Sequence, residues 1–458
     1  MKRQFDKKKI FVGILAILIF SFLFIKSIYN YNQYFTVNKD IVGMRFLNII
    51  TLALSSVVLY KFSKEFLNEN HAFSASLLFL VTPIITYTIV EWTHITSVFF
   101  VLVIFYGFYL YMKTNELKWL IIFSVFSGFL GNIRYVEVVM IIPLLIYITY
   151  TIIKNKRYNH LILFSLLFTI SISPTLLFQY MHFGNPFLTP YHLRPYSLGD
   201  HPKTNIAKEF DVTRSISTIP YMLIDFNPDK IPPTTGDTDY SFRYFKSSVL
   251  QSTPFFSLSV FGICFLFKES KKFITLLILS MSLITITYSS WVYYGGGWTV
   301  SMRYLSTLIP FLLIFAMAAV QKLKIEKSYM LLNLLITIPL IIFLLILPLR
   351  NMTYPSALNN VPQKRLMNPI NLFLSIALLL SYTIHYLTGN KLLSKITLSL
   401  FVVSIASSIV MVFIVDNIIT FTGSYLTLFI YNFSSSFFMS LTFLSSLIYL
   451  ILYLTNKI

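Results

Sequence analysis

The chain has 458 residues, of which 56% are hydrophobic and only 12% are charged. Soluble globular proteins carry about 25% charged residues, so this composition excludes an ordinary cytosolic enzyme. The 45 Phe, 30 Tyr and 4 Trp residues exclude a disordered chain. The net charge of +19 is spread over short basic clusters between apolar runs, which is typical of membrane-protein loops and does not indicate nucleic-acid binding. The single cysteine, Cys264, excludes an intrachain disulfide.

Continuous apolar runs of about 20 residues predict membrane-spanning helices, whereas barrel strands would alternate in polarity. We therefore expect an all-α polytopic membrane protein with thirteen to fifteen spans, fourteen being preferred. The first run lacks a following small-residue cleavage site, which favours a membrane anchor over a signal peptide. The predicted spans lie near 10–28, 41–62, 71–90, 94–112, 117–132, 135–153, 160–178, 254–267, 273–290, 303–320, 328–348, 367–387, 396–415 and within 424–454.

Basic residues predict the orientation of the chain. With a cytoplasmic N-terminus, 21 of the 36 Lys and Arg residues fall in short inside loops, and 11 of the 17 acidic residues fall outside. This asymmetry follows the positive-inside rule. We expect a multi-pass protein of the cell membrane whose active face is extracytoplasmic.

One predicted outer loop, residues 179–253, is much longer than the others. Loops of this length in compact proteins are functional or disordered, and the many aromatic residues here favour an ordered cap. This loop divides the chain into a predicted N-terminal module of about seven helices (1–178), the cap (179–253), a motif-bearing helical region (254–320) and C-terminal helices (321–458).

Ionisable side chains gather near the predicted outer ends of the spans. A charged group at the centre of a span costs about 2.5–3.5 kcal/mol, so its presence needs a reason. A shared outer site would use the acids for proton chemistry and the arginines for a phosphate; snorkelling at the interface and local ion pairs are the alternative. The residues are Asp40, Arg45, Glu91, His94, Arg134, Glu137 and Arg303.

The run from Trp291 to Trp298 contains three consecutive glycines flanked by aromatic residues. Three glycines disfavour a helix and predict a tight turn at the membrane surface. Such a turn lets backbone approach a ligand, and aromatic faces suit sugar rings or prenyl chains; an aromatic belt beside a loop is the alternative.

Four short motifs follow one another along the first 320 residues. They are Gly131-Asn132-Ile133-Arg134-Tyr135, then His182-Phe183-Gly184-Asn185-Pro186-Phe187, then Ser252-Thr253-Pro254-Phe255-Phe256, and finally Ser289-Ser290-Trp291 through Gly296-Gly297-Trp298 to Arg303-Tyr304-Leu305 and Pro310-Phe311. In this order they resemble the membrane glycosyltransferases of superfamily C, in the dolichyl-phosphate-mannose protein mannosyltransferase-like group. The resemblance covers roughly residues 40–320.

The resemblance implies a sugar donor on a polyprenyl phosphate such as dolichol and transfer on the outer face. Inverting transfer needs a carboxylate to take the acceptor proton and a cation to stabilise the departing phosphate. The family's catalytic acid lies in the first outer loop, but here only residues 29–40 join the first two spans. Either Asp40 or Glu91 is then the catalytic base, or this member has lost activity. The predicted substrate- and phosphate-binding residues are Arg134, Glu137, Trp298, Arg303 and Tyr304.

The long outer loop contains the residues expected to meet the acceptor, His182, Asp237 and Asp239. The Asp237-Thr238-Asp239 triplet favours a loop turn over a metal site, and the loop histidines match no zinc-ligand spacing. Arginines can carry the charge of the leaving phosphate, so no cofactor is required, although a divalent metal stays open.

The predicted partners are a polyprenyl-phosphate-linked sugar, membrane lipid, and an acceptor that is a protein, lipid or glycan, as in protein glycosylation. Two other functions stay open. A transporter or flippase of lipid-linked sugars would place charges at mid-bilayer, whereas here they lie at span ends. A non-catalytic lipid-binding member is favoured by the short first outer loop.

Overall fold

The structure is a computed structural model that describes residues 39–84, 93–187, 210–224, 248–291, 303–324 and 362–419. Within these ranges every regular element is a helix, and Phe210 and Trp291 form one isolated antiparallel β-bridge. The expected all-α architecture is confirmed. The spans expected near 10–28, 328–348 and 424–454 lie outside the described residues.

Seven helices within the described ranges are long and apolar enough to cross a membrane. They cover His94–Thr114, Tyr135–Lys154, Tyr158–Phe183, Lys271–Ser290, Tyr304–Lys322, Ile370–Thr388 and Lys391–Ile409. Each coincides with a span expected from the apolar runs. A multi-pass helical membrane protein is therefore the fold class.

The chain forms two compact units, which we describe separately. The first, here the α13 unit, comprises residues 96–222 and 270–295; the second, the α14 unit, comprises residues 1–95, 223–269 and 296–458. The division at 178, 253 and 320 expected from the sequence stays a prediction.

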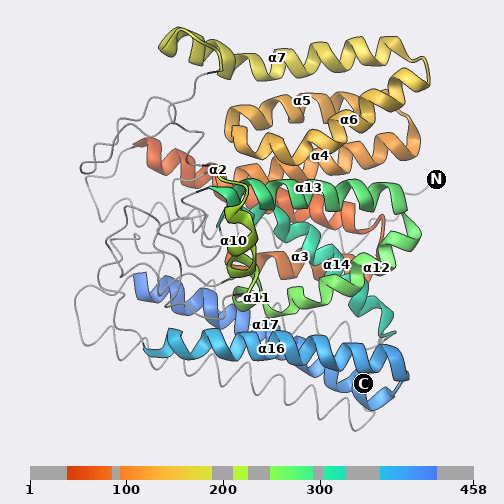
Figure 1. Ribbon diagram of the computed structural model, residues 1–458, viewed down its shortest axis with the longest axis vertical. Helices are drawn as coiled ribbons and strands as arrows, with labels where there is room; N and C mark the ends of the chain where they lie inside the picture. The colour runs from red at the N-terminus through yellow and green to blue at the C-terminus, as the bar shows by residue number, and fades with distance from the viewer. Residues whose placement is uncertain are drawn as a thin grey trace, which may run out of the picture. The chain divides into compact units, whose positions relative to one another are not determined.

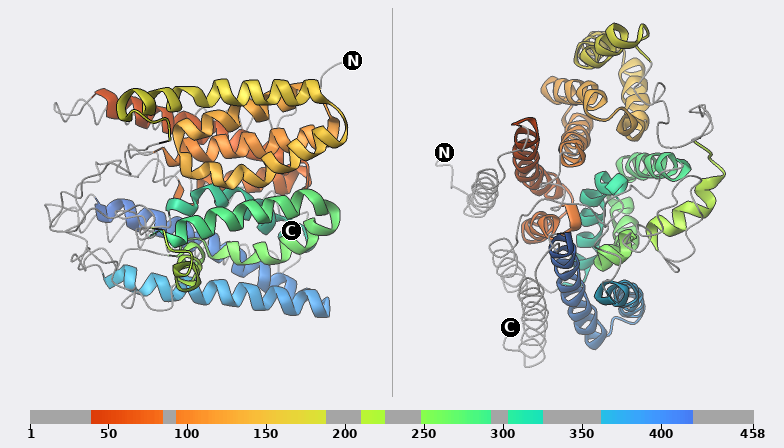
Figure 2. Two further views of the ribbon diagram at one scale, coloured as in Figure 1. Left: turned by 45° about the horizontal axis from the view of Figure 1, so that its top comes forward. Right: turned by 90° about the vertical axis from the view of Figure 1, so that its left-hand side faces the viewer.

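Four consecutive helices of the α13 unit are joined by short turns and run side by side with α13 in Figures 1 and 2. The elements of this unit are α4 (His94–Thr114), α5 (Leu117–Ile133), the 3-10 turn η2 (Tyr135–Glu137), α6 (Val138–Lys154), α7 (Tyr158–Phe183), α10 (Arg214–Leu223) and α13 (Lys271–Ser290). One end of this unit carries Lys113, Lys118, Lys154, Arg157 and Lys271 at helix termini. The opposite end carries the α5–α6 turn and the C-terminus of α13.

A glycine lets α5 and α7 pack closely. A Cβ on Gly128 would lie 2.6 Å from the carbonyl oxygen of Phe168 and 2.6 Å from Cβ of Ser171, so only glycine fits. The Asn132 Nδ2 donates a hydrogen bond to the Ser171 oxygen at 2.7 Å. Small residues and interhelical hydrogen bonds are the usual basis of helix association in lipid.

The outward side of α7 is apolar and exposed. Ile162, Leu166, Ile170 and Leu177 are each more than half exposed. Side chains of this kind on a helix of span length are expected to contact lipid tails rather than water.

The α14 unit contains a further set of helices. They are α2 (Lys39–Ser63), α3 (Glu69–Leu80), α11 (Val249–Ser252), η5 (Pro254–Leu258), α12 (Ser259–Glu269), η6 (Arg303–Leu308), α14 (Ile309–Lys322), α16 (Pro362–Thr388) and α17 (Lys391–Ile419). Helices α12 and α14 approach most closely at Gly262, where a Cβ would lie 1.7 Å from the Phe315 carbonyl oxygen. The Tyr382 hydroxyl of α16 donates to the Ala319 oxygen at 2.9 Å, which joins α16 to α14.

Three elements differ from their sequence-based boundaries. In the span expected over 71–90, α3 ends at Leu80 and a turn follows before Pro83, while residues 85–90 lie outside the described residues. Proline disfavours helical backbone at the preceding residue, which accounts for this end. The span expected over 254–267 consists of η5 followed by α12. Helix α7 continues to Phe183, past the expected end of its span at 178, and α10 lies within residues 179–253.

Candidate functional site

A break between α5 and α6 places two charged side chains at one end of the α13 unit. Helix α5 ends because Arg134 adopts extended backbone, with φ −153° and ψ 97°. The 3-10 turn η2 then carries the chain to Glu137, after which α6 begins. This short connection places the Arg134 and Glu137 side chains, three residues apart, on the same side of the turn.

Glu137 is completely buried and is held by two other side chains. The Tyr288 hydroxyl donates a hydrogen bond to Glu137 Oε1 at 2.9 Å. Arg134 Nη1 lies 3.4 Å from the same oxygen, with its side chain 15% exposed. The Arg134 guanidinium also lies 5.8 Å from the centre of the Tyr288 ring. We call these three residues the Glu137 cluster.

A buried carboxylate is stable only when charge and hydrogen bonds compensate its lost hydration. Tyr288 and Arg134 provide both to Glu137. The arrangement in turn fixes the direction of the guanidinium, whose planar fork of donors suits a phosphate. The sequence placed Arg134 and Glu137 in one predicted turn as candidate phosphate-binding residues, without pairing them with each other. Tyr288 was missed, because it lies 151 residues further along the chain.

The segment 210–214 is attached to the C-terminal turn of α13, the helix that contributes Tyr288. The ring of Phe210 stacks on Trp291 with centroids 6.2 Å apart and planes 10° apart. Two donors meet the Ser290 carbonyl oxygen, the backbone N–H of Asp211 at 2.9 Å and Arg214 Nη1 at 3.2 Å. A cation there complements the negative end of the α13 dipole.

Asp211 shapes the start of α10. Its Oδ1 accepts hydrogen bonds from the Thr213 backbone N–H at 2.9 Å and from the Thr213 hydroxyl at 2.6 Å. These bonds stabilise the carboxylate and lower the pKa of Asp211 below its ordinary value, with a smaller contribution from the Arg214 charge.

Other predicted site residues are placed separately. In the α14 unit, Tyr304 is buried and its ring lies 6.0 Å from that of His94. Asp40 lies in the first turn of α2 and Arg303 begins η6, but the described side chains do not include theirs. Glu91, Trp298, Asp237 and Asp239 lie outside the described residues.

His182 lies at the end of α7 and is exposed. Its ring stacks on Phe178 with centroids 4.0 Å apart, and its Nδ1 lies 2.9 Å from the Phe178 oxygen. Within the described ranges no three His, Cys, Asp or Glu side chains are grouped so that they could hold a metal ion.

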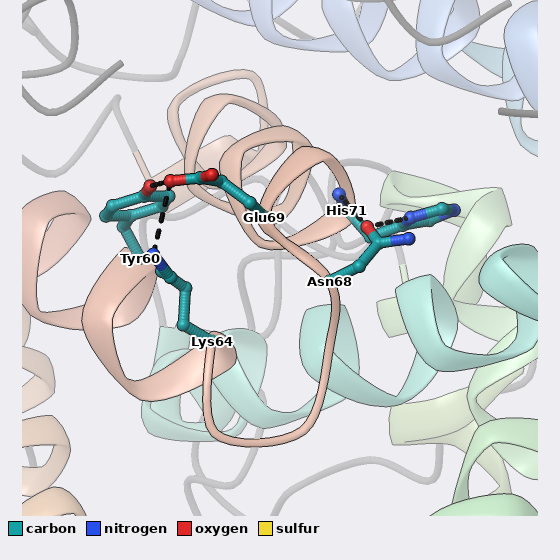
Figure 3. Close-up of polar contacts among 5 residues, drawn as sticks. All are labelled: Tyr60, Lys64, Asn68, Glu69 and His71. Atoms are coloured by element: carbon teal, nitrogen blue, oxygen red, sulfur yellow. Dashed lines mark hydrogen bonds and ion pairs between the residues drawn. The ribbon is translucent and has the colours of Figure 1, made fainter. Parts of the chain in front are cut away.

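A second polar cluster, which the sequence analysis did not single out, lies at the turn between α2 and α3 (Figure 3). Glu69 Oε1 accepts a hydrogen bond from the Tyr60 hydroxyl at 2.9 Å and from Lys64 Nζ at 3.2 Å. Asn68 caps α3 by accepting the His71 backbone N–H at 3.0 Å. These contacts fix the geometry of the turn between α2 and α3. The sequence contains a signal for it, because an Asn followed by a Glu and then an apolar run is typical of a capped helix N-terminus.

The comparison with protein families bears on the segment that contains the Glu137 cluster's two charged residues. A family model described as dolichyl-phosphate-mannose-protein mannosyltransferase matches residues 32–178, about a third of the chain. The resemblance to that family is confirmed. The mannosyltransferase-like segment contains Asp40, Glu91, Arg134 and Glu137. The match supports a membrane glycosyltransferase in general terms.

The other two comparisons found nothing. No curated protein matches the chain, and no solved structure matches it. The motifs beyond residue 178, including Arg303-Tyr304-Leu305, therefore depend on the sequence resemblance alone.

Proposed function

We propose that this protein transfers a sugar from a polyprenyl-phosphate donor to an acceptor on the extracytoplasmic face of the cell membrane. The observation that carries the proposal is the Glu137 cluster, whose two charged members lie in the mannosyltransferase-like segment. An arginine held by a buried carboxylate at the end of a helical membrane unit suits an anionic headgroup.

The proposed chemistry is a single displacement. The acceptor hydroxyl loses its proton to a carboxylate, either Asp40 or Glu91, as its oxygen bonds to the anomeric carbon. The bond between that carbon and the phosphate oxygen breaks, and the polyprenyl phosphate departs with the electron pair. Arg134 stabilises the charge that develops on this phosphate. Arg303 is proposed as a phosphate-binding residue from its sequence motif alone.

Further residues are proposed to position the two substrates. Trp298 and Tyr304 offer aromatic faces to the sugar or the prenyl chain. His182, Asp237 and Asp239 meet the acceptor from the long loop. Glu137 orients Arg134 and is not proposed to touch the reacting atoms.

The test uses the full chain in nanodiscs with radiolabelled polyprenyl-phosphate mannose, glucose and arabinose, together with membranes of cells lacking the gene as the acceptor source. We expect one donor to lose its label to the protein, lipid or glycan fraction. Arg134→Ala should weaken donor binding at least about tenfold, the loss expected for a charge-assisted phosphate contact. Arg157→Ala is the matched control, because Arg157 lies at the opposite end of the α13 unit, where its Nη1 donates to Asn115 Oδ1.

The short connection between the first two predicted spans favours a second candidate, a lipid-binding member without activity. In that case the protein binds the donor in an Arg134-dependent way, yet no sugar leaves it. Loss of transfer in Asp40→Asn or Glu91→Gln with donor binding intact would instead identify the base. Absence of both binding and transfer for every donor overturns the proposed function.

A further inference from the structure

Helix α10 has a buried side and an outer side that exposes apolar residues. The buried side carries Ser215, Thr218 and Met222, which are 5%, 2% and 0% exposed. On the outer side, Ile216 is 81% exposed, and Val212 in the preceding turn is 68% exposed. Two neighbouring apolar side chains this exposed, on a short helix attached to a helix of span length, favour an apolar surrounding on the outer side.

The contacts of α10 fix its depth relative to a candidate span. The Ser215 hydroxyl donates to the Ile286 oxygen at 3.2 Å, one turn before α13 ends, and Arg214 Nη1 donates to the Ser290 oxygen. The N-terminal turn of α10 therefore lies at the level of the last turn of α13. Figure 1 shows α10 crossing the direction of α13 rather than continuing along it.

The surface of α13 next to this contact is itself apolar and exposed. Leu279 is 51% exposed and Ile286 is 38% exposed, and their spacing of seven residues places them on one face of the helix. A span-length helix presents such a face to lipid. Because Ser215 contacts the backbone of Ile286, Ile216 extends this lipid-facing surface onto α10.

The remaining side of α10 is polar at Ser217. At 3.6 residues per turn, Ser217 lies away both from the buried side and from Ile216. Ser217 is exposed, whereas Arg214 is partly exposed and directs its guanidinium to the Ser290 oxygen. The Phe210–Trp291 stack lies at the same level, as aromatic residues do at membrane interfaces. The helix thus has a protein side, an apolar side and a polar side.

We propose that α10 lies in the plane of the membrane interface, with Ile216 and Val212 inserted among lipid acyl chains and Ser217 facing the headgroups and water. The partner is the lipid bilayer itself. This interaction surface would hold the long loop against the membrane at the end of α13, whatever reaction the protein carries out.

Site-specific fluorescence quenching tests the proposal in the full chain. Cys264→Ser removes the one native cysteine, and bimane is then attached at Ile216→Cys or at the neighbouring control Ser217→Cys, both exposed positions. The protein is reconstituted into phosphatidylcholine–phosphatidylglycerol vesicles. Lipids doxyl-labelled near the top of the acyl chain should quench the probe at 216 several-fold more than at 217, and aqueous iodide should show the reverse order.

Val212→Cys gives an independent probe on the apolar side and should behave like Ile216→Cys. Equal iodide quenching at 212, 216 and 217, with no preference for the doxyl lipid, would overturn the interfacial assignment. If neither the doxyl lipid nor iodide quenches the probe at 216 strongly, another protein segment covers this side of α10. That result also overturns the interfacial assignment.

Discussion

Glu137 shows how one buried charge can organise a site. Its carboxylate accepts a hydrogen bond from the Tyr288 hydroxyl and forms an ion pair with Arg134, and it is not exposed to solvent. Removing the carboxylate in Glu137→Ala leaves the guanidinium uncompensated, and we expect the free energy of unfolding to fall by about 3 kcal/mol. Tyr288→Phe removes one hydrogen bond to a charged group and should cost about 2 kcal/mol.

These losses are measured as unfolding in mixed micelles with increasing SDS. Glu116→Ala is the matched control, because Glu116 pairs with Lys118 at an exposed position and should contribute no more than about 1 kcal/mol. Equal losses for Glu137→Ala and Glu116→Ala would show that the Glu137 cluster has no special stabilising role.

The hydrogen bonds of Asp211 predict how the attachment of segment 210–214 to α13 depends on pH. The folded pKa of Asp211 is lowered by hydrogen bonds from Thr213, so the stabilisation is present above the ordinary pKa of aspartate, about 3.9, and is lost as the pH falls through the lowered folded value. We expect Trp291 emission, in a variant whose three other tryptophans are replaced by Phe, to report detachment of Phe210 in acid. In Thr213→Val, which lacks the hydroxyl donor, this transition should move to higher pH.

Ser217→Ala serves as the control for this titration, because its hydroxyl donates to the Arg214 oxygen and does not contact Asp211. If Asp211→Asn retains the same acid transition, another group is responsible for it.

Inference from sequence at the residue scale depends on how close two partners are in the chain. Arg134 and Glu137 are three residues apart at a predicted span boundary, so the sequence shows their proximity, but their ion pair was not among the predictions. The hydroxyl of Tyr288 reaches Glu137 only through the packing of α6 against α13, which no local pattern specifies. Phe210 and Trp291 are likewise brought together by tertiary structure.

At the scale of elements, close helix approach depends on single glycines. A Cβ at Gly262 would lie 1.7 Å from the Phe315 oxygen, so Gly262→Ala must push α12 away from α14. We expect a loss of about 3 kcal/mol in the same SDS titration. Gly107→Ala is the control: its nearest neighbour would be Ile122 Cγ2 at 3.4 Å, and removing a helical glycine should gain up to about 1 kcal/mol.

If Gly262→Ala lowers the free energy of unfolding no more than Gly107→Ala does, α12 and α14 are not in the close contact described.

The apolar runs predicted the presence of both helices, because length and hydropathy decide that question. They could not predict which glycine lies at the crossing point, since that depends on how two distant segments face each other. The end of α3 before Pro83, by contrast, could have been predicted from the local sequence, because the proline marks it. The continuous apolar run led instead to the prediction of one long span.

At the scale of the whole molecule, the orientation in the membrane decides which face the Glu137 cluster occupies. Positive-inside asymmetry predicts that the lysine-bearing end of the α13 unit is cytoplasmic, and therefore that the α5–α6 turn and α10 are extracytoplasmic.

The single native cysteine makes this orientation testable, because Cys264→Ser gives a cysteine-free chain. In intact cells a membrane-impermeant maleimide should label Ser217→Cys, in α10, and should leave Asn159→Cys, in the first turn of α7, unlabelled until the membrane is permeabilised. Both positions are exposed, so access to the reagent depends on the side of the membrane alone. The opposite labelling pattern would place the Glu137 cluster in the cytoplasm, where a donor displayed on the outer leaflet could not reach Arg134.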